Sequence, residues 1–262
     1  MQALVSSLGL PWMTAVVLLA TRIAAALLLT PLLYAVKMPA VVRLLMVTGI
    51  ACVLALPFAS RPGVQLDDPA ALVAAILREA VVGATLGLGV LMAFAGFSIA
   101  GRLVDLQLGF GIAQVFDPQT QARVPILSAI FGLLAVVFFF AVEGHHALLR
   151  GIAFSVERFP PGVGLPHTAA AEPLLRQGAS LFALGFALAA PVVLGLLLVE
   201  FVLGVIARNL PQVNMLLMGV PVKIVAGLFA LSIWVGGFGP PARRLYDSIY
   251  QAWSAWFAGG LR

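Results

Sequence analysis

The chain has 262 residues, of which 62% are hydrophobic and only 10% are charged. Soluble domains carry about 25% charged residues, so this composition indicates an integral membrane protein or one embedded in a membrane-associated complex. The formal net charge of +5 comes from scattered single cations and not from a basic face, which argues against a nucleic-acid-binding protein. The single cysteine, Cys52, cannot form an internal disulfide, and residues 1–11 lack the Lys or Arg of a signal peptide.

The first half of the chain contains three apolar runs, at about residues 8–36, 41–58 and 70–100. Each approaches or exceeds the roughly 18–20 residues that a helix needs to cross a bilayer. Arg22 lies in the middle of the first run, where an arginine must pair, extend to the membrane surface or face another subunit. The third run should end near residue 100, so that residues 101–105 lead into the next segment.

The second half of the chain predicts three more apolar helices, at about residues 126–142, 180–206 and 215–238. Residues 147–159 between them are moderately amphipathic, and a further helix should start at Glu172. The tail places apolar residues on one face of a helix, which predicts a terminal interfacial helix and not a further span: Leu245, Ile249, Trp253 and Trp256. The sequence therefore predicts an all-α fold of membrane-associated helical hairpins, with about six long apolar helices and a C-terminal amphipathic helix.

The third apolar run carries both a charged pair and a face of small residues. Arg78 and Glu79 are adjacent, so on a helix they point about 100° apart and each needs an external partner or a route to the interface. Gly83 and Gly87 are four residues apart on one face, and small residues at this spacing let another helix approach closely. We therefore expect this helix to have a tightly packed neighbour.

The stretch from Leu106 to Pro125 lies between two long apolar runs but cannot be a simple membrane helix. Its backbone is loosened or interrupted by glycines and prolines, and one carboxylate would be costly in hydrocarbon: Gly109, Gly111, Pro118, Pro125 and Asp117. It also carries apolar side chains that a solvated loop does not need: Phe110, Ile112, Val115 and Phe116. Such a segment is tolerated at membrane depth if it is buried in protein or lines a cavity. It is either a covered connector or a plug that can move.

No catalytic, cofactor or metal site emerges from the sequence. The adjacent His145 and His146 lack the four-residue spacing of zinc-binding histidines on a helix. There is no phosphate-binding loop and no nucleophile motif. The ionisable residues within the apolar runs, including Glu79 and Glu200, occur singly, which leaves a proton-coupled or small-solute transporter open as an alternative.

Four local patterns occur in an order that resembles the export-gate family of the flagellar biosynthetic protein FliR. They are Arg78-Glu79 followed by Gly83 and Gly87; Gly109 with Asp117-Pro118 and then Pro125; Gly144-His145 after an aromatic helix end; and Arg208-x-x-Pro211-Gln212-x-Asn214 followed by Gly219-x-Pro221. The similarity covers nearly the whole chain. The family also contains SctT-like components of virulence type III secretion systems, so both flagellar and virulence export are compatible with it.

This resemblance implies a non-enzymatic component of the type III protein-export gate in the bacterial inner membrane, within the flagellar basal body. Its implied partners are FliP-like and FliQ-like subunits, FlhB-like and FlhA-like export proteins, unfolded export substrates and membrane lipid, without nucleic acid or a cofactor. It further implies a single domain over residues 1–262, with a FliP-like portion at 1–179 and a FliQ-like hairpin and tail at 180–262.

The resemblance also implies roles for individual residues. Leu108 to Val124 is the candidate pore plug, with Phe110, Ile112 and Phe116 as occluding side chains. The residues of this plug or gate are Gly109, Phe110, Gly111, Ile112, Val115, Phe116, Asp117 and Pro118. Helix packing and assembly are expected to depend on Arg78, Glu79, Gly83, Gly87, Glu200, Arg208, Pro211, Gln212, Asn214, Pro221 and Lys223.

Overall fold

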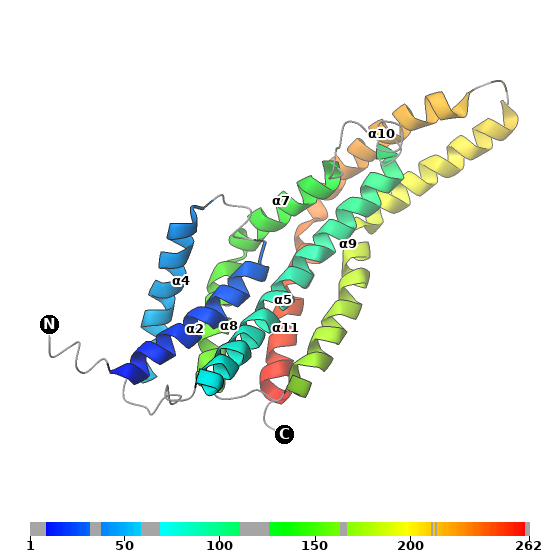
Figure 1. Cartoon of the computed structure of the whole chain (residues 1–262). Coiled ribbons are helices and arrows are strands. Elements are labelled where there is room, and N and C mark those ends of the chain that lie inside the picture. The colour runs from blue at the N-terminus through cyan, green and yellow to red at the C-terminus, as the bar shows by residue number, and fades with distance from the viewer. Residues whose placement is uncertain are drawn as a thin grey trace. The chain divides into compact units, whose positions relative to one another are not determined.

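The computed structural model describes residues 9–31, 38–58, 69–110, 126–162, 167–210, 212 and 214–259, and these form helices without strands (Figure 1). The α-helices are α2 (Leu10–Leu29), α4 (Ala40–Ala55), α5 (Pro69–Leu108), α7 (Ile126–Ala141), α8 (Gly144–Arg158), α9 (His167–Asn209), α10 (Met215–Trp234) and α11 (Gly239–Gly259). Two short 3-10 turns, η1 (Leu56–Phe58) and η2 (Val235–Gly237), continue α4 and α10. The all-α prediction is therefore confirmed.

Two long helices differ from their predicted bounds. α5 has 40 residues and continues through residues 101–105, where a break was expected. The expected break was wrong because Gly101 and Asp105 are buried against the start of α7, which satisfies them inside a helix. α5 ends instead at Gly109, whose φ of 82° is the left-handed conformation typical of a helix C-terminus. α9 starts at His167, earlier than the predicted Glu172.

The chain divides into two compact units that interleave along the sequence. Unit 1 contains residues 1–92, 143–177 and 249–262, and unit 2 contains residues 93–142 and 178–248. α5, α9 and α11 each contribute residues to both units. Neither unit corresponds to the predicted portions 1–179 and 180–262, and that division stays a prediction.

In unit 1, α2 lies beside α4 and also packs against α5 (Figure 1). The contact with α5 is made at the predicted face of small residues. A Cβ atom at Gly83 would overlap the carbonyl oxygen of Arg22, and one at Gly87 would overlap that of Ala26. α2 is therefore the tightly packed neighbour that the glycine spacing predicted.

Also in unit 1, α8 packs against the C-terminal part of α11. The face of α8 with Leu148, Ile152 and Ser155 is buried, as its amphipathic pattern indicates. Gly151 leaves room for the indole of Trp253, and the rings of Phe159 and Trp256 stack with centroids 5.7 Å apart.

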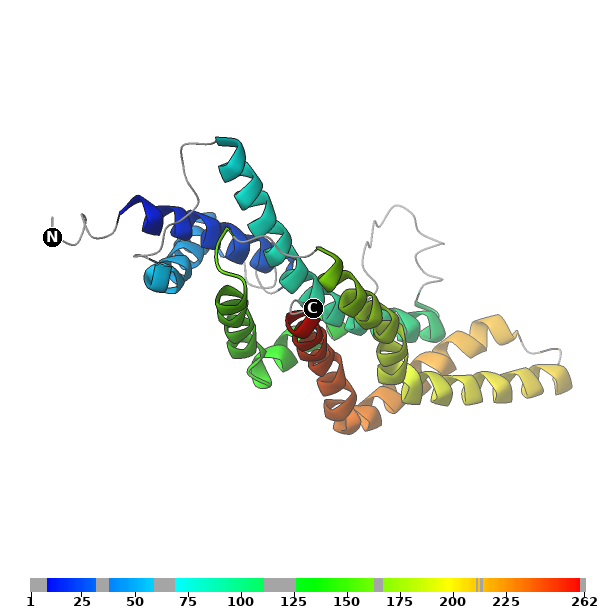
Figure 2. The same cartoon turned by 90° about the horizontal axis from the view of Figure 1, so that it is seen from below.

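Unit 2 is built around an aromatic core contributed by α5, α7 and the start of α11. The ring centroids of Phe97 and Tyr246 lie 5.4 Å apart, and the Tyr246 hydroxyl donates a hydrogen bond of 2.6 Å to the carbonyl oxygen of Ala135. The C-terminal part of α9 and α10 lie side by side as an antiparallel hairpin (Figures 1 and 2), where Gly219 faces the side chain of Leu203.

The amphipathic pattern of α11 is present, but protein covers its apolar face. Its predicted apolar residues, Leu245, Ile249, Trp253 and Trp256, are all buried, whereas Arg243, Arg244, Asp247 and Gln251 are exposed. An interfacial position for the apolar face was therefore the wrong expectation, because other helices of units 1 and 2 bury it.

Within the described ranges, five helices are long and apolar enough to cross a membrane, or six if α7 and α8 together form one broken span: α2, α4 with η1, α5, α9 and α10 with η2. Several of them expose large apolar side chains. Leu44 and Leu45 on α4, Phe201 on α9 and Phe229 on α10 are each about two-thirds exposed. Surfaces of this kind need a cover of lipid or protein.

Candidate functional site

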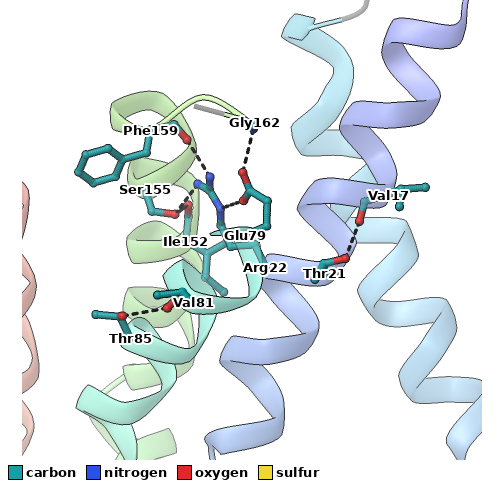
Figure 3. Close-up of polar contacts among 10 residues, drawn as sticks. All are labelled: Val17, Thr21, Arg22, Glu79, Val81, Thr85, Ile152, Ser155, Phe159 and Gly162. Atoms are coloured by element: carbon teal, nitrogen blue, oxygen red, sulfur yellow. Dashed lines mark hydrogen bonds and ion pairs between the residues drawn. The ribbon is translucent and has the colours of Figure 1, made fainter. Parts of the chain in front are cut away.

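A buried ion pair joins α2 to α5 within unit 1. Arg22 Nε donates to Glu79 Oε2 at 2.6 Å, and the two side chains are 0% and 1% exposed. Figure 3 shows the guanidinium of Arg22 directed toward the Glu79 carboxylate and toward the end of α8. Of the three environments considered for Arg22, the structure selects pairing. It also gives Glu79 the partner that a buried carboxylate needs.

Two further contacts connect this pair to α8. Arg22 Nη1 donates to Ser155 Oγ at 3.2 Å, and Nη2 donates to the carbonyl oxygen of Phe159 at 2.8 Å. The second oxygen of Glu79 accepts a 2.9 Å bond from the backbone N–H of Gly162 (Figure 3). We name these five residues the Arg22 network. Such a set of contacts offsets the desolvation of both charges and fixes α2, α5 and the end of α8 together.

Arg78 behaves differently from Glu79, although both were expected to serve assembly. Its side chain is exposed on α5, while Glu79 points into unit 1. This follows from the 100° turn between adjacent helical residues. The exposed side chain of Arg78 can therefore contact a group that lies outside the described residues.

A second buried carboxylate, Asp105, lies near the end of α5 in unit 2. Its two oxygens accept hydrogen bonds from the backbone N–H groups of Leu127 at 3.1 Å and Ser128 at 2.8 Å, in the first turn of α7. Ser128 Oγ in turn donates to the carbonyl oxygen of Ser98 at 3.2 Å. These contacts join the last described turns of α5 to the start of α7.

The predicted plug lies between these two helix ends and is described only at its beginning. Gly109 ends α5, with its N–H bonded to the carbonyl oxygen of Leu106 at 3.2 Å, and Phe110 is half-buried. The other plug candidates lie outside the described residues: Gly111, Ile112, Val115, Phe116, Asp117 and Pro118. The structure thus describes where this stretch begins, at the end of α5. The role of the stretch as a plug stays a prediction.

Glu200 and Lys223, treated as single embedded charges in the sequence, form a pair across the hairpin of unit 2. Lys223 Nζ donates to Glu200 Oε1 at 3.1 Å, with 18% of the lysine side chain and 52% of the glutamate side chain exposed. Of the other assembly candidates, Arg208, Gln212, Asn214 and Pro221 are exposed, and Pro211 lies outside the described residues.

The histidine pair stands at the turn between α7 and α8. His146 Nδ1 lies 3.6 Å from the Glu143 carboxylate, and both side chains are largely exposed. Among the described residues, no group of three His, Cys, Asp or Glu side chains could hold a metal ion.

Sequence reasoning missed Asp105 and Ser155 as members of buried polar clusters. The only available indication for Asp105 was a carboxylate at the junction of an apolar helix and an irregular stretch. Ser155 had no such indication, because a serine on the buried face of an amphipathic helix is ordinary. The partner of Arg22 was also missed, since it lies 57 positions away.

Among the described residues, five or six helices have the length and the apolar composition that are typical of a helical membrane protein. The chain belongs to the family described as Bacterial export proteins, family 1, whose sequence model matches residues 13–249. The resemblance stated from the sequence is therefore confirmed.

Several relatives agree with this family. The chain is 34% identical over 215 residues to the flagellar biosynthetic protein FliR of Bacillus subtilis (strain 168), which covers 81% of this chain and 82% of the relative. It is 26% identical over 175 residues to that of Escherichia coli (strain K12), covering 67% of each. It is also 25% identical over 192 residues to the Yop proteins translocation protein T of Yersinia pestis, covering 71% of this chain and 73% of the relative.

Proposed function

We propose that this chain is a non-enzymatic subunit of the type III protein-export gate in the bacterial inner membrane, in the flagellar export apparatus. The observation that carries the proposal is the family match over residues 13–249, together with the 34% identity to a flagellar relative. The identity to the Yersinia translocation protein is lower, at 25%. This difference favours flagellar over virulence export.

The gate is proposed to form with FliP-like and FliQ-like subunits, next to FlhB-like and FlhA-like export proteins. The exposed apolar surfaces of α4, α9 and α10 are compatible with this, because partner subunits as well as lipid can cover them. Residues 1–179 are proposed as the FliP-like portion and residues 180–262 as the FliQ-like portion. The exposed Arg208, Gln212 and Asn214 suit an assembly contact, as does Arg78.

The stretch Leu108–Val124 is proposed to plug the pore. Apolar side chains packed across a narrow channel exclude water and ions by dewetting. Phe110, Ile112 and Phe116 are the proposed occluding side chains. The stretch connects the end of α5 at Gly109 to the start of α7 at Ile126, and we propose that an unfolded export substrate displaces it.

A small-solute or proton-coupled transporter is the alternative from another class. Such a carrier needs a carboxylate that gains and loses a proton. Both candidates are engaged by cations: Glu79 by Arg22 at 2.6 Å and Glu200 by Lys223 at 3.1 Å. In both cases the contact occupies a carboxylate oxygen and joins two helices, which favours a structural role.

The test is ion conductance of membranes that contain the chain with its FliP-like and FliQ-like partners. Deleting residues 111–116 keeps Gly109 as the end of α5 while shortening the proposed plug. We expect this deletion to leak ions while the complex still co-purifies. A matched variant replaces the same six positions with glycine and serine, which keeps the length and removes the apolar side chains.

The outcomes separate three functions. A leak in both variants supports an apolar plug. A tight membrane in both, with the complex assembled, rejects the plug and leaves the chain a scaffold. Stoichiometric binding of a small solute by the chain without its partners would instead support the transporter.

A further inference from the structure

Asp105 caps a helix to which it is not adjacent in the sequence. The first N–H groups of an α-helix have no partner within the helix and need acceptors from elsewhere. In most helices the residue just before the helix supplies one. Here Asp105, on α5, accepts from Leu127 and Ser128 at 3.1 and 2.8 Å, and its side chain is 2% exposed. The start of α7 is therefore satisfied by another helix.

The capping contact is reinforced by close packing of the same two helices. A Cβ atom at Gly101 would lie 2.6 Å from Ser128 Cα, so the backbones of α5 and α7 touch at this point. Ser128 Oγ adds a 3.2 Å bond to the carbonyl oxygen of Ser98. The carboxylate also interacts favourably with the positive end of the α7 dipole. Together these contacts span almost two turns of α5.

We propose that Asp105 is a positioning residue that holds the end of α5 to the start of α7 independently of the residues between them. This role rests on the proposed function, because α5 and α7 are the helices that flank the proposed plug. Because α7 takes its cap from α5, displacement of the connecting stretch leaves both helix ends in place.

The first test measures the anchor itself by hydrogen–deuterium exchange, resolved to single amides, in the assembled complex. Asp105→Ala removes both acceptor oxygens, whereas Asp105→Asn keeps one. Loss of a cap raises exchange at the Leu127 and Ser128 amides roughly 5- to 30-fold. Amides of α5 at residues 82–86 should not change. The matched control Arg102→Gln alters an exposed charge three positions away on α5 and should leave both regions unchanged.

Independence from the stretch is tested by deleting residues 111–116. Protection of the Leu127 and Ser128 amides should persist in this deletion and be lost when Asp105→Ala is added. Loss of protection in the deletion alone overturns the proposal, since the cap would then depend on the connecting residues. Unchanged protection in Asp105→Ala overturns it as well.

The second test is ion conductance of the same complexes. Asp105→Ala should leak more than Asp105→Asn, which keeps one acceptor, and Arg102→Gln should stay tight. If the deletion of 111–116 leaks while both Asp105 variants stay tight, the positioning role is rejected and the plug stands. If the deletion itself does not leak, the plug is rejected, and the exchange measurement alone decides whether Asp105 holds the helices together.

Discussion

Two glutamates on apolar helices illustrate two ways of accommodating a charge. Glu79 in unit 1 is 1% exposed and is bonded to Arg22 and to the N–H of Gly162. Glu200 in unit 2 is 52% exposed and has one described contact, with Lys223. The first is satisfied wholly within the chain. The surroundings of the second depend on what covers the hairpin of α9 and α10.

This difference predicts where charge matters for folding and where it matters for assembly. Removing one partner of a buried ion pair destabilises a protein strongly, because the remaining charge stays buried without an opposite charge. An ion pair exposed to water contributes little, typically up to about 1 kcal/mol. The following predictions test this contrast, from the largest expected effect to the smallest.

Arg22→Met should produce the largest loss of stability. It leaves Glu79 buried and unpaired, which costs about 3–5 kcal/mol in comparable buried pairs. The double variant Arg22→Met with Glu79→Leu should recover most of this loss, since neither charge remains. Thermal unfolding of the purified chain in detergent provides the measurement. A double variant as unstable as the single one would mean that the contacts to Ser155 and Phe159, and not the ion pair, hold unit 1 together.

Gly83→Ala should be the next most damaging change. The added Cβ would overlap the carbonyl oxygen of Arg22, and a backbone atom cannot move aside cheaply. Overpacking of this kind typically costs about 1–3 kcal/mol. Gly49→Ala on α4 is the matched control, because its Cβ would meet nothing within 4 Å. It should be neutral or stabilising by up to about 1 kcal/mol, as helix propensity predicts. Equal unfolding temperatures for the two variants would contradict the close contact of α2 with α5.

Tyr246→Phe should have a smaller effect in unit 2. It removes the 2.6 Å hydrogen bond to the carbonyl oxygen of Ala135 but keeps the ring in the aromatic core. A single hydrogen bond of this type contributes about 1 kcal/mol. Tyr246→Ala, which also removes the ring, should be several times worse in the same unfolding assay. If Tyr246→Phe were as damaging as Tyr246→Ala, the hydroxyl and not the ring would dominate this core.

Lys223→Met should change the stability of the isolated chain by less than about 1 kcal/mol, because the pair with Glu200 is partly exposed. A loss as large as that of Arg22→Met would abolish the contrast between the two glutamates. Co-purification with FliP-like and FliQ-like partners is the second measurement. Reduced assembly without reduced stability would show that a partner covers this pair.

Sequence reasoning found the helices where the apolar pattern is uninterrupted. The runs predicted at residues 41–58, 126–142 and 215–238 match α4 with η1, α7, and α10 with η2 within a few residues. It missed the end of α5, because Gly101 and Asp105 resemble helix breakers when viewed locally. In the fold they are contacts to α7, and tertiary packing decided the outcome.

The candidate site was predictable in kind but not in detail. Burial of Arg22 and Glu79 in apolar runs implied that each needs a partner, yet the sequence does not say that they partner each other. The glycine spacing at Gly83 and Gly87 implied a close neighbour but not that α2 is that neighbour. Likewise, the pattern of α11 gave its apolar face, while only the fold shows that protein covers it.

α5 carries a long interval without ionisable side chains, bounded by Glu79 on one side and Arg102 on the other. Residues 80–101 number 22 and contain no Asp, Glu, Lys or Arg. At about 1.5 Å per residue they rise about 33 Å along the helix, close to the roughly 30 Å hydrocarbon thickness of a bilayer. Because Glu79 is buried, the exposed charges that flank this interval are Arg78 and Arg102, and lipids with longer or shorter acyl chains would act on α5 through hydrophobic mismatch there.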